Sequence, residues 1–238
     1  TVRISKIGTP RRITWPRMTR RQSPNRRLIC EALEDRRLLA TMVVTDLGDT
    51  GIGTLREAVQ MANDSPGIDE IQFAASLEGQ AISLSSGEIA ITEALTISAE
   101  DFANDVVIDV SPSDPTPDVP DGQGSRVFYV SFEDDSNDDF FVLNNLSLQG
   151  GDVDGDGGLL YSTSKTRIED SLFLDSHATG HGGAIAVRGR LDIVNSRVSG
   201  NTAANGGGAI SSSGTLNARG LKITENSAAI GGGIALPA

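Results

Sequence analysis

Three aspartates of the chain fall at the spacing of a cation-binding loop. Asp152, Asp154 and Asp156 precede Gly157 in the pattern D-x-D-x-D-G, which is the first half of a calcium loop. The twelfth position of such a loop carries a bidentate glutamate, but here it is Thr163, so the loop is incomplete. The pattern therefore predicts carboxylate ligands without a complete set.

Both histidines of the chain join this group through a repeat. His177 lies 25 residues after Asp152, and His181 lies 25 residues after Asp156. If equivalent residues of successive repeats stack, each imidazole lies next to a carboxylate. Aspartates alone favour calcium, whereas carboxylates with imidazoles suit a transition metal. The alternative interpretation is a glycine-rich turn whose surface charges bind nothing, and both remain open at this point.

The repeat has a period of 25 residues and fills about the last hundred positions. Four apolar columns and one column of glycine pairs keep the same phase. They are Leu143, Ile168, Ile193 and Ala218; Leu148, Phe173, Val198 and Ile223; Val153, Ala178, Ala203 and Ala228; Leu160, Ile185 and Ile210; and the pairs 157–158, 182–183, 207–208 and 232–233. A fixed period indicates a stacked solenoid, in which each repeat is buried against its neighbours.

Within a repeat, apolar and polar residues alternate over short stretches such as Leu191–Ile193 and Leu221–Ile223. Alternation is typical of strands with one buried face, and Gly, Asn and Ser between them favour turns. The spacing of a leucine-rich repeat is missing. We therefore expect an all-β fold, a right-handed single-stranded parallel β-helix with about 25 residues and three short strands per coil. It would resemble the pectin-lyase-like solenoids.

Charge divides the chain near residue 40. Residues 1–40 contain 11 of the 20 Lys and Arg and three acidic residues, whereas the rest has 9 basic and 29 acidic residues. We expect 1–40 to be a disordered basic targeting arm, 41–70 an N-terminal cap, and 71–238 the β-helix, with regular coils from about residue 140. The acidic body would repel phosphate, so no nucleic-acid partner is expected.

Other features set further limits. The single cysteine, Cys30, excludes an intramolecular disulfide framework. No run of 18 apolar residues occurs, so no transmembrane helix is expected. The segment Ser111–Ser125, rich in Asp, Pro and Gly, is expected to be an exposed loop that does not pack.

A short helix is expected in the cap. Its buried stripe at i, i+3, i+4 and i+7 consists of Leu55, Ala58, Val59 and Ala62. Asp49 or Thr50 could cap its start, and Asn63 followed by Pro66 would end it. An amphipathic helix in this place would cover the open end of the solenoid.

Three segments resemble known bacterial families. Residues 43–73 resemble the CSLREA-type module that opens many β-helix proteins, with Thr54–Val59 as its signature and Gly53 at the family's cysteine position. Residues 31–40 resemble the LEPRxLL-type segment of large exported surface proteins, with Asp35 in place of the usual proline. The repeated GGAI and GNTA phrases resemble those of polymorphic outer-membrane and adhesin-like proteins. These phrases are residues 182–185, 207–210 and 200–203.

The resemblances imply an exported protein, at the cell surface or outside the cell, with a structural or adhesin-like role and no evident catalytic site. Polysaccharides or surface proteins would be its partners. The alternative is a polysaccharide lyase or glycosidase whose catalytic coils lie outside this segment.

The nearest catalytic candidates are Asp170, Asp175, Arg188 and Arg190. Asp170 aligns with Asn145 and Asn195, which indicates a turn position rather than a general acid. Glycoside hydrolysis needs two opposed carboxyl groups, and no such pair is evident on neighbouring coils.

The end of the sequence gives a last expectation. The final coil stops at Ala238 in mid-phase, shortly after Gly231–Ile234. We expect the natural protein to continue with more coils, and this chain to self-associate through its open C-terminal coil.

Overall fold

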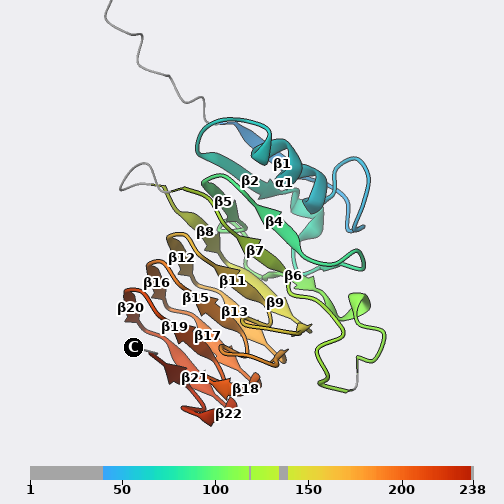
Figure 1. Cartoon of the computed structure of the whole chain (residues 1–238). Coiled ribbons are helices and arrows are strands. Elements are labelled where there is room, and N and C mark those ends of the chain that lie inside the picture. The colour runs from blue at the N-terminus through green and yellow to red at the C-terminus, as the bar shows by residue number, and fades with distance from the viewer. Residues whose placement is uncertain (1–39, 118, 134–138, 237–238) are drawn as a thin grey trace, which may run out of the picture. The chain divides into compact units, whose positions relative to one another are not determined.

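The computed structural model describes residues 40–117, 119–133 and 139–236, and these wind into a parallel β-solenoid (Figure 1). Four sheets run along the solenoid, and each strand pairs in parallel with the equivalent strands of the coils before and after it. The predicted all-β solenoid is confirmed, while the hand of its coil stays a prediction.

The strands of the four sheets follow the order of the coils. Sheet A contains β1 (Thr41–Val44), β2 (Asp69–Phe73), β5 (Leu95–Ser98), β8 (Phe141–Asn144), β12 (Thr166–Glu169), β16 (Leu191–Val194) and β20 (Leu216–Arg219). Sheet B contains β3 (Ala81–Ser83), β6 (Val106–Asp109), β9 (Leu146–Gln149), β13 (Leu172–Leu174), β17 (Arg197–Ser199) and β21 (Lys222–Thr224). Sheet C contains β4 (Ile89–Ile91), β7 (Phe128–Val130), β11 (Leu160–Ser162), β15 (Ile185–Val187), β19 (Ile210–Ser212) and β23 (Ile234–Ala235). Sheet D contains β10 (Asp152–Val153), β14 (His177–Ala178), β18 (Thr202–Gly206) and β22 (Ser227–Ile230).

Each regular coil therefore has four strands, and the expectation of three was wrong. The additional strand belongs to sheet D and is only two residues long in β10 and β14. A strand this short carries a single core residue, such as Val153 or Ala178, so it produces no alternating pattern in the sequence.

The register confirms all four predicted apolar columns. Representative partners are Ile168 with Leu143 and Ile193, Phe173 with Leu148 and Val198, Ala178 with Val153 and Ala203, and Ile185 with Leu160 and Ile210. The three largest buried side chains, Phe128, Phe141 and Phe173, are fully enclosed. Like therefore stacks on like through one continuous core.

The glycine pairs turn the chain from sheet D into sheet C. The first glycine of each pair has a positive φ, +72° at Gly157 and +68° at Gly182, which other residues adopt only with strain. The second glycine lies against the next coil, where a Cβ on Gly183 would collide with the carbonyl oxygen of Gly208. Both members of the pair are thus required by the backbone.

In the last coil the predicted pair was wrong by one residue. Gly208 lies against Gly232, and β19 pairs Ile210 with Ile234, one residue closer than the period requires. The shift arises between Ala203 and Gly206, where the pairing of β18 with β22 is irregular.

A ladder of polar side chains closes the turn before sheet D. Asn201 is fully buried, and its Oδ1 accepts hydrogen bonds from the backbone N–H and the hydroxyl of Ser176, 25 residues earlier. Asn226 accepts in the same way from the backbone and side chain of Asn201. These amides satisfy backbone groups that would otherwise be buried without partners.

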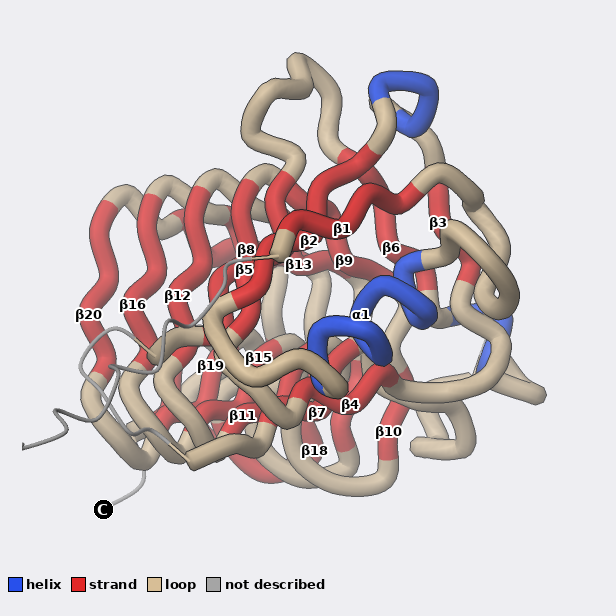
Figure 2. Tube along the Cα trace, turned by 90° about the horizontal axis from the view of Figure 1, so that it is seen from above, coloured by secondary structure: helices blue, strands red, loops and turns tan. Residues whose placement is uncertain are grey.

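Helix α1 (Leu55–Asn63) buries the four predicted residues and lies across the N-terminal end of the coils, between sheets A and C (Figure 2). Its N-cap is Thr54, whose hydroxyl accepts from the N–H of Glu57, so the expected caps at Asp49 and Thr50 were wrong. The carboxylate of Glu57 in turn accepts from the N–H of Gly53 at 2.5 Å. This reciprocal arrangement is close to a capping box.

Asp49 has a different role from capping the helix. Its carboxylate binds Arg56 at 2.8 Å and accepts from the backbone N–H groups of Ser85 and Ser86, which join the cap to the first coil. Burial opposes its ionisation, but the hydrogen bonds from Ser86, Arg56 and Ser85 lower the pKa of Asp49 to about 2.

Two single-turn 3₁₀ helices complete the described structure, η1 (Ala75–Leu77) and η2 (Ser111–Ser113). Among the described helices, none is both long and apolar enough to cross a membrane. The basic segment 1–39, and with it most of the predicted targeting arm, lies outside the described residues.

Candidate functional site

The predicted metal residues lie along sheet D and the turn that follows it. Asp152 of β10 is the ladder partner of His177 of β14, and their Oδ1 and Nδ1 atoms are 2.6 Å apart. The stacking of this carboxylate and imidazole, inferred from the repeat, is therefore present. Asp152 is buried and His177 is partly exposed.

The other predicted ligands are engaged differently. The Asp154 carboxylate accepts from the hydroxyl of Thr179 at 2.7 Å. The Asp156 carboxylate accepts from the backbone N–H of His181 at 2.8 Å, so it binds the main chain of that residue. Nδ1 of His181 is buried next to Gly206 without a hydrogen-bond partner among the described residues. Three aspartates in one row thus each contact the following coil.

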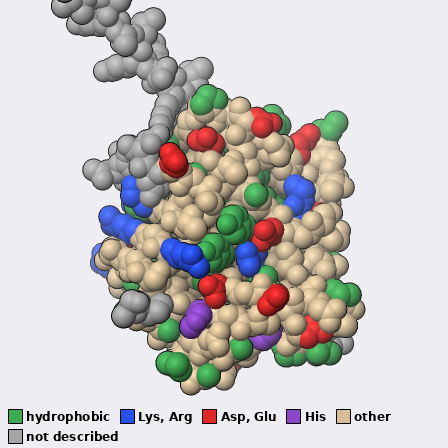
Figure 3. Space-filling view, in the orientation of Figure 1, with side chains coloured by type: hydrophobic (Ala, Val, Ile, Leu, Met, Phe, Trp, Pro, Cys, Tyr) green, Lys and Arg blue, Asp and Glu red, His purple; other side chains and the backbone are tan. Residues whose placement is uncertain are grey.

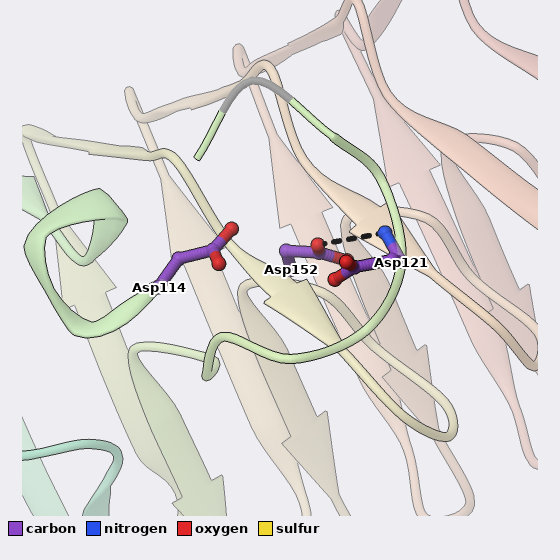
Figure 4. A group of neighbouring side chains, drawn as sticks. All are labelled: Asp114, Asp121 and Asp152. Atoms are coloured by element: carbon purple, nitrogen blue, oxygen red, sulfur yellow. Dashed lines mark hydrogen bonds between the residues drawn. The ribbon is translucent and has the colours of Figure 1, made fainter. Parts of the chain in front are cut away.

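A different set of three carboxylates comes together around Asp152. Within the described residues, one group has ligand oxygens that all lie within 4.8 Å of one another, and it consists of Asp114, Asp121 and Asp152 (Figure 4). Asp114 follows η2 and is buried, whereas Asp121 is exposed on the loop that crosses sheet D. Three carboxylates at this distance are a ligand set suited to calcium.

The loop between η2 and β7 brings these carboxylates together because it packs against sheet D. The N–H groups of Asp121 and Gly122 donate to the two carboxylate oxygens of Asp152 at 3.0 and 2.9 Å. Gly124 approaches so closely that a Cβ there would lie 2.9 Å from the carbonyl oxygen of Asp152. The expectation that Ser111–Ser125 does not pack was therefore wrong.

Sequence reasoning missed Asp114 and Asp121 because they belong to a long insertion outside the repeat. The available signal was the pair of glycines at 122 and 124, since glycine permits close approach of one backbone to another.

Beside the cluster of Asp114, Asp121 and Asp152, a hollow of about 230 Å³ is lined by Asp114, Asp152, Asp175 and His177.

The four catalytic candidates are distributed over different turns. Asp170 and Asp175 occupy positive-φ positions, +48° and +49°, at the two ends of β13. Asn145 and Asn195 have the same conformation, which confirms that this column is a turn position. Arg190 pairs with Asp192 at 2.8 Å, and Arg188 lies over the ring of Tyr161.

The Arg190 pair stabilises the ionised form of its partner. Burial alone would raise the pKa of Asp192, but hydrogen bonds from Arg190 and Asn217 hold that pKa below its ordinary value. This aspartate is therefore ionised at neutral pH and acts as a structural link to the next coil, where Asn217 donates at 2.7 Å.

Comparison with known proteins bears on one coil of the solenoid. Residues 195–213 match the repeat of Chlamydia polymorphic membrane proteins. The matched segment begins at a turn asparagine, passes through β17, β18 and the glycine pair, and ends just after β19. The resemblance seen in the repeated phrases is thereby confirmed for this coil. No curated protein and no solved structure matches the chain.

Proposed function

We propose that this chain belongs to an exported, surface-displayed protein whose solenoid serves as an adhesin-like scaffold. The observation that carries the proposal is the match of residues 195–213 to a polymorphic membrane protein repeat, because that match covers three consecutive strands of one coil, β17, β18 and β19. The outward positions of such a coil are free to vary while the core columns hold the fold. Long rows of side chains are thus available for binding.

Export and display can be tested on the organism that makes the protein. Antibodies raised against the purified chain should label intact, unpermeabilised cells, and protease added to those cells should remove the signal. A cytoplasmic enzyme should remain unlabelled and uncleaved in the same sample. Labelling that requires cell lysis would contradict the proposal.

We also propose calcium as a ligand near Asp152, favoured by the convergence of Asp114 and Asp121 on this residue. Millimolar calcium should raise the melting temperature of the chain, since a ligand that binds only the native state stabilises it. Neutralising Asp121 with asparagine should remove most of this shift. Differential scanning fluorimetry with and without a chelator provides the measurement.

A second variant separates this cluster from the row predicted by the sequence. Asp154→Asn should preserve the calcium shift if the ion binds Asp114, Asp121 and Asp152. It should abolish the shift if the ion binds Asp152, Asp154 and Asp156. A transition metal held by His177 would give a zinc-dependent shift instead, and a melting temperature insensitive to both ions would contradict every version of the site.

Self-association through the last coil also remains a proposal. In the described chain, β20, β21, β22 and β23 are the final strands of their sheets, each with one edge free of a neighbour. Ile230 beside this edge is 72% exposed. Unpaired parallel edges with an apolar side chain favour addition of a further strand.

A further inference from the structure

On the outward face of sheet C, one column of side chains changes from aromatic to small residues. Its column contains Tyr129, Tyr161, Ala186 and Ser211 on four successive coils. The two tyrosine rings stack with centroids 5.4 Å apart and an angle of 18° between their planes. Beyond Tyr161 the side chains of this column are small. Ala186 on β15 and Ser211 on β19 therefore form a lower surface next to the Tyr161 ring, which we call the shelf.

Two arginines lie next to the tyrosine rings, and they differ in whether the guanidinium group pairs with a carboxylate. Arg126 lies over both tyrosines, but its side chain is largely buried and pairs with Glu88 at 3.1 Å. Arg188 is exposed, and its guanidinium carbon lies 5.5 Å from the centre of the Tyr161 ring. Within the described part of the chain, Arg188 forms no ion pair with a carboxylate. Its charge is therefore available to a ligand.

The shelf is the floor of a groove of about 360 Å³. Its lining includes Asp156, Tyr161, His181, Ala186, Arg188 and Ser211, which come from three successive coils. The space-filling view shows apolar side chains gathered at the centre of this face, with basic side chains on both sides and an acidic and a histidine side chain below (Figure 3). An aromatic surface with a few polar groups around it is typical of a small-ligand site.

We propose that this groove binds an anionic glycan, with one sugar ring against Tyr161 and its carboxylate or sulfate group on Arg188. The guanidinium fork matches the geometry of such oxyanions. The carboxylate of Asp156, which also lines the groove, supplies a hydrogen-bond acceptor for sugar hydroxyls.

Size and charge favour this occupant over a protein partner. A stable protein interface buries about 800 Å² per partner, whereas a hollow of about 360 Å³ has the size of a small-ligand pocket. From Thr41 onward the chain has 29 acidic and only 9 basic residues, so an exposed arginine that forms no ion pair among the described residues is a favourable place for a negative group. The inference deepens the proposed adhesin-like function and rests on it for the biological role of binding.

Calorimetric titration of the 238-residue chain tests the groove directly. The probes are hexagalacturonate, which carries carboxylates, a heparin-derived hexasaccharide, which carries sulfates, and maltohexaose, which is neutral. We expect at least one anionic probe to bind and the neutral one not to bind, with affinity falling as salt is raised. The two anionic probes decide which oxyanion the groove prefers.

Variants connect binding to the named residues. Arg188→Gln and Tyr161→Ala should each weaken the affinity at least about tenfold, equivalent to about 1.4 kcal/mol. Alanine already occupies the equivalent position on the next coil, at Ala186, so the second variant should fold, which circular dichroism verifies. Arg219→Gln, an exposed arginine on sheet A, is the matched control and should bind as the parent does.

The inference is overturned if no anionic probe binds at millimolar concentration, if maltohexaose binds equally well, or if both groove variants retain full affinity. Each of these results leaves the surface-display proposal intact, because that proposal is tested on whole cells. Conversely, if the chain binds the glycan but is not found at the cell surface, the proposed adhesin-like role is contradicted and the proposed binding site is supported.

Discussion

Replacing Val198 with aspartate should lower the free energy of unfolding by about 4 kcal/mol or more, the scale of an unpaired charge in an apolar core. Val198 is fully buried on β17, between Phe173 of the preceding coil and Ile223 of the next. The carboxylate would find no cation in that column. Urea denaturation followed by circular dichroism measures the difference.

Val43→Asp is the matched control, because it makes the same chemical change on a strand of the same solenoid. Val43 lies on β1 with half of its surface exposed, so its substitution should alter stability by less than about 0.5 kcal/mol. If the two variants unfold at the same urea concentration, the assignment of Val198 to a buried core column is contradicted.

Substituting alanine for Gly183 should also be severe, costing about 3 kcal/mol by overpacking. The added methyl group would collide with the carbonyl oxygen of Gly208 and lie 2.6 Å from that of Thr202, both on the next coil. Backbone atoms on a hydrogen-bonded coil cannot move aside without breaking ladder bonds. The melting temperature should therefore fall by several degrees.

Gly233→Ala is the control for this change. A Cβ at Gly233 meets only the side chain of Ile223, at 3.3 Å, and the residue needs no positive φ. Its stability should change by a few tenths of a kcal/mol. Equal losses in the two variants would mean that the close approach of coils at Gly183 is not what selects glycine there.

The repeat made most of this fold predictable. Residues such as Ile168, Phe173 and Ile185 could be assigned to core columns because equivalent positions recur at a constant spacing, and stacking then fixes their partners. The helix stripe was equally clear, because its period differs from that of the strands.

The features that were missed depend on contacts without a period. The cap at Thr54 is completed by the hydrogen bond from the N–H of Gly53 to the carboxylate of Glu57. The carboxylate of Asp49 accepts hydrogen bonds from Ser85 and Ser86, which are far from it in the sequence. The approach of Asp114 and Asp121 to Asp152 depends on how one insertion folds back onto sheet D. The local sequence does not fix such a path, so the sequence indicated Asp152 as a candidate ligand but not the two aspartates of the insertion that lie beside it.

The constant spacing has a consequence for how such a gene can change. Equivalent residues in β12, β16 and β20 are separated by 25 positions, and β16 forms its ladder pairs with β12 on the coil before and with β20 on the coil after. Duplication or loss of one whole coil would therefore leave every remaining ladder pair in register, whereas deletion of one residue within a strand would turn its buried side chains outward. In the last coil one residue is missing, and the pairing of β18 with β22 loses its regular register at that place, between Ala203 and Gly206. The number of coils can thus vary by recombination more readily than the spacing of the core residues within a coil.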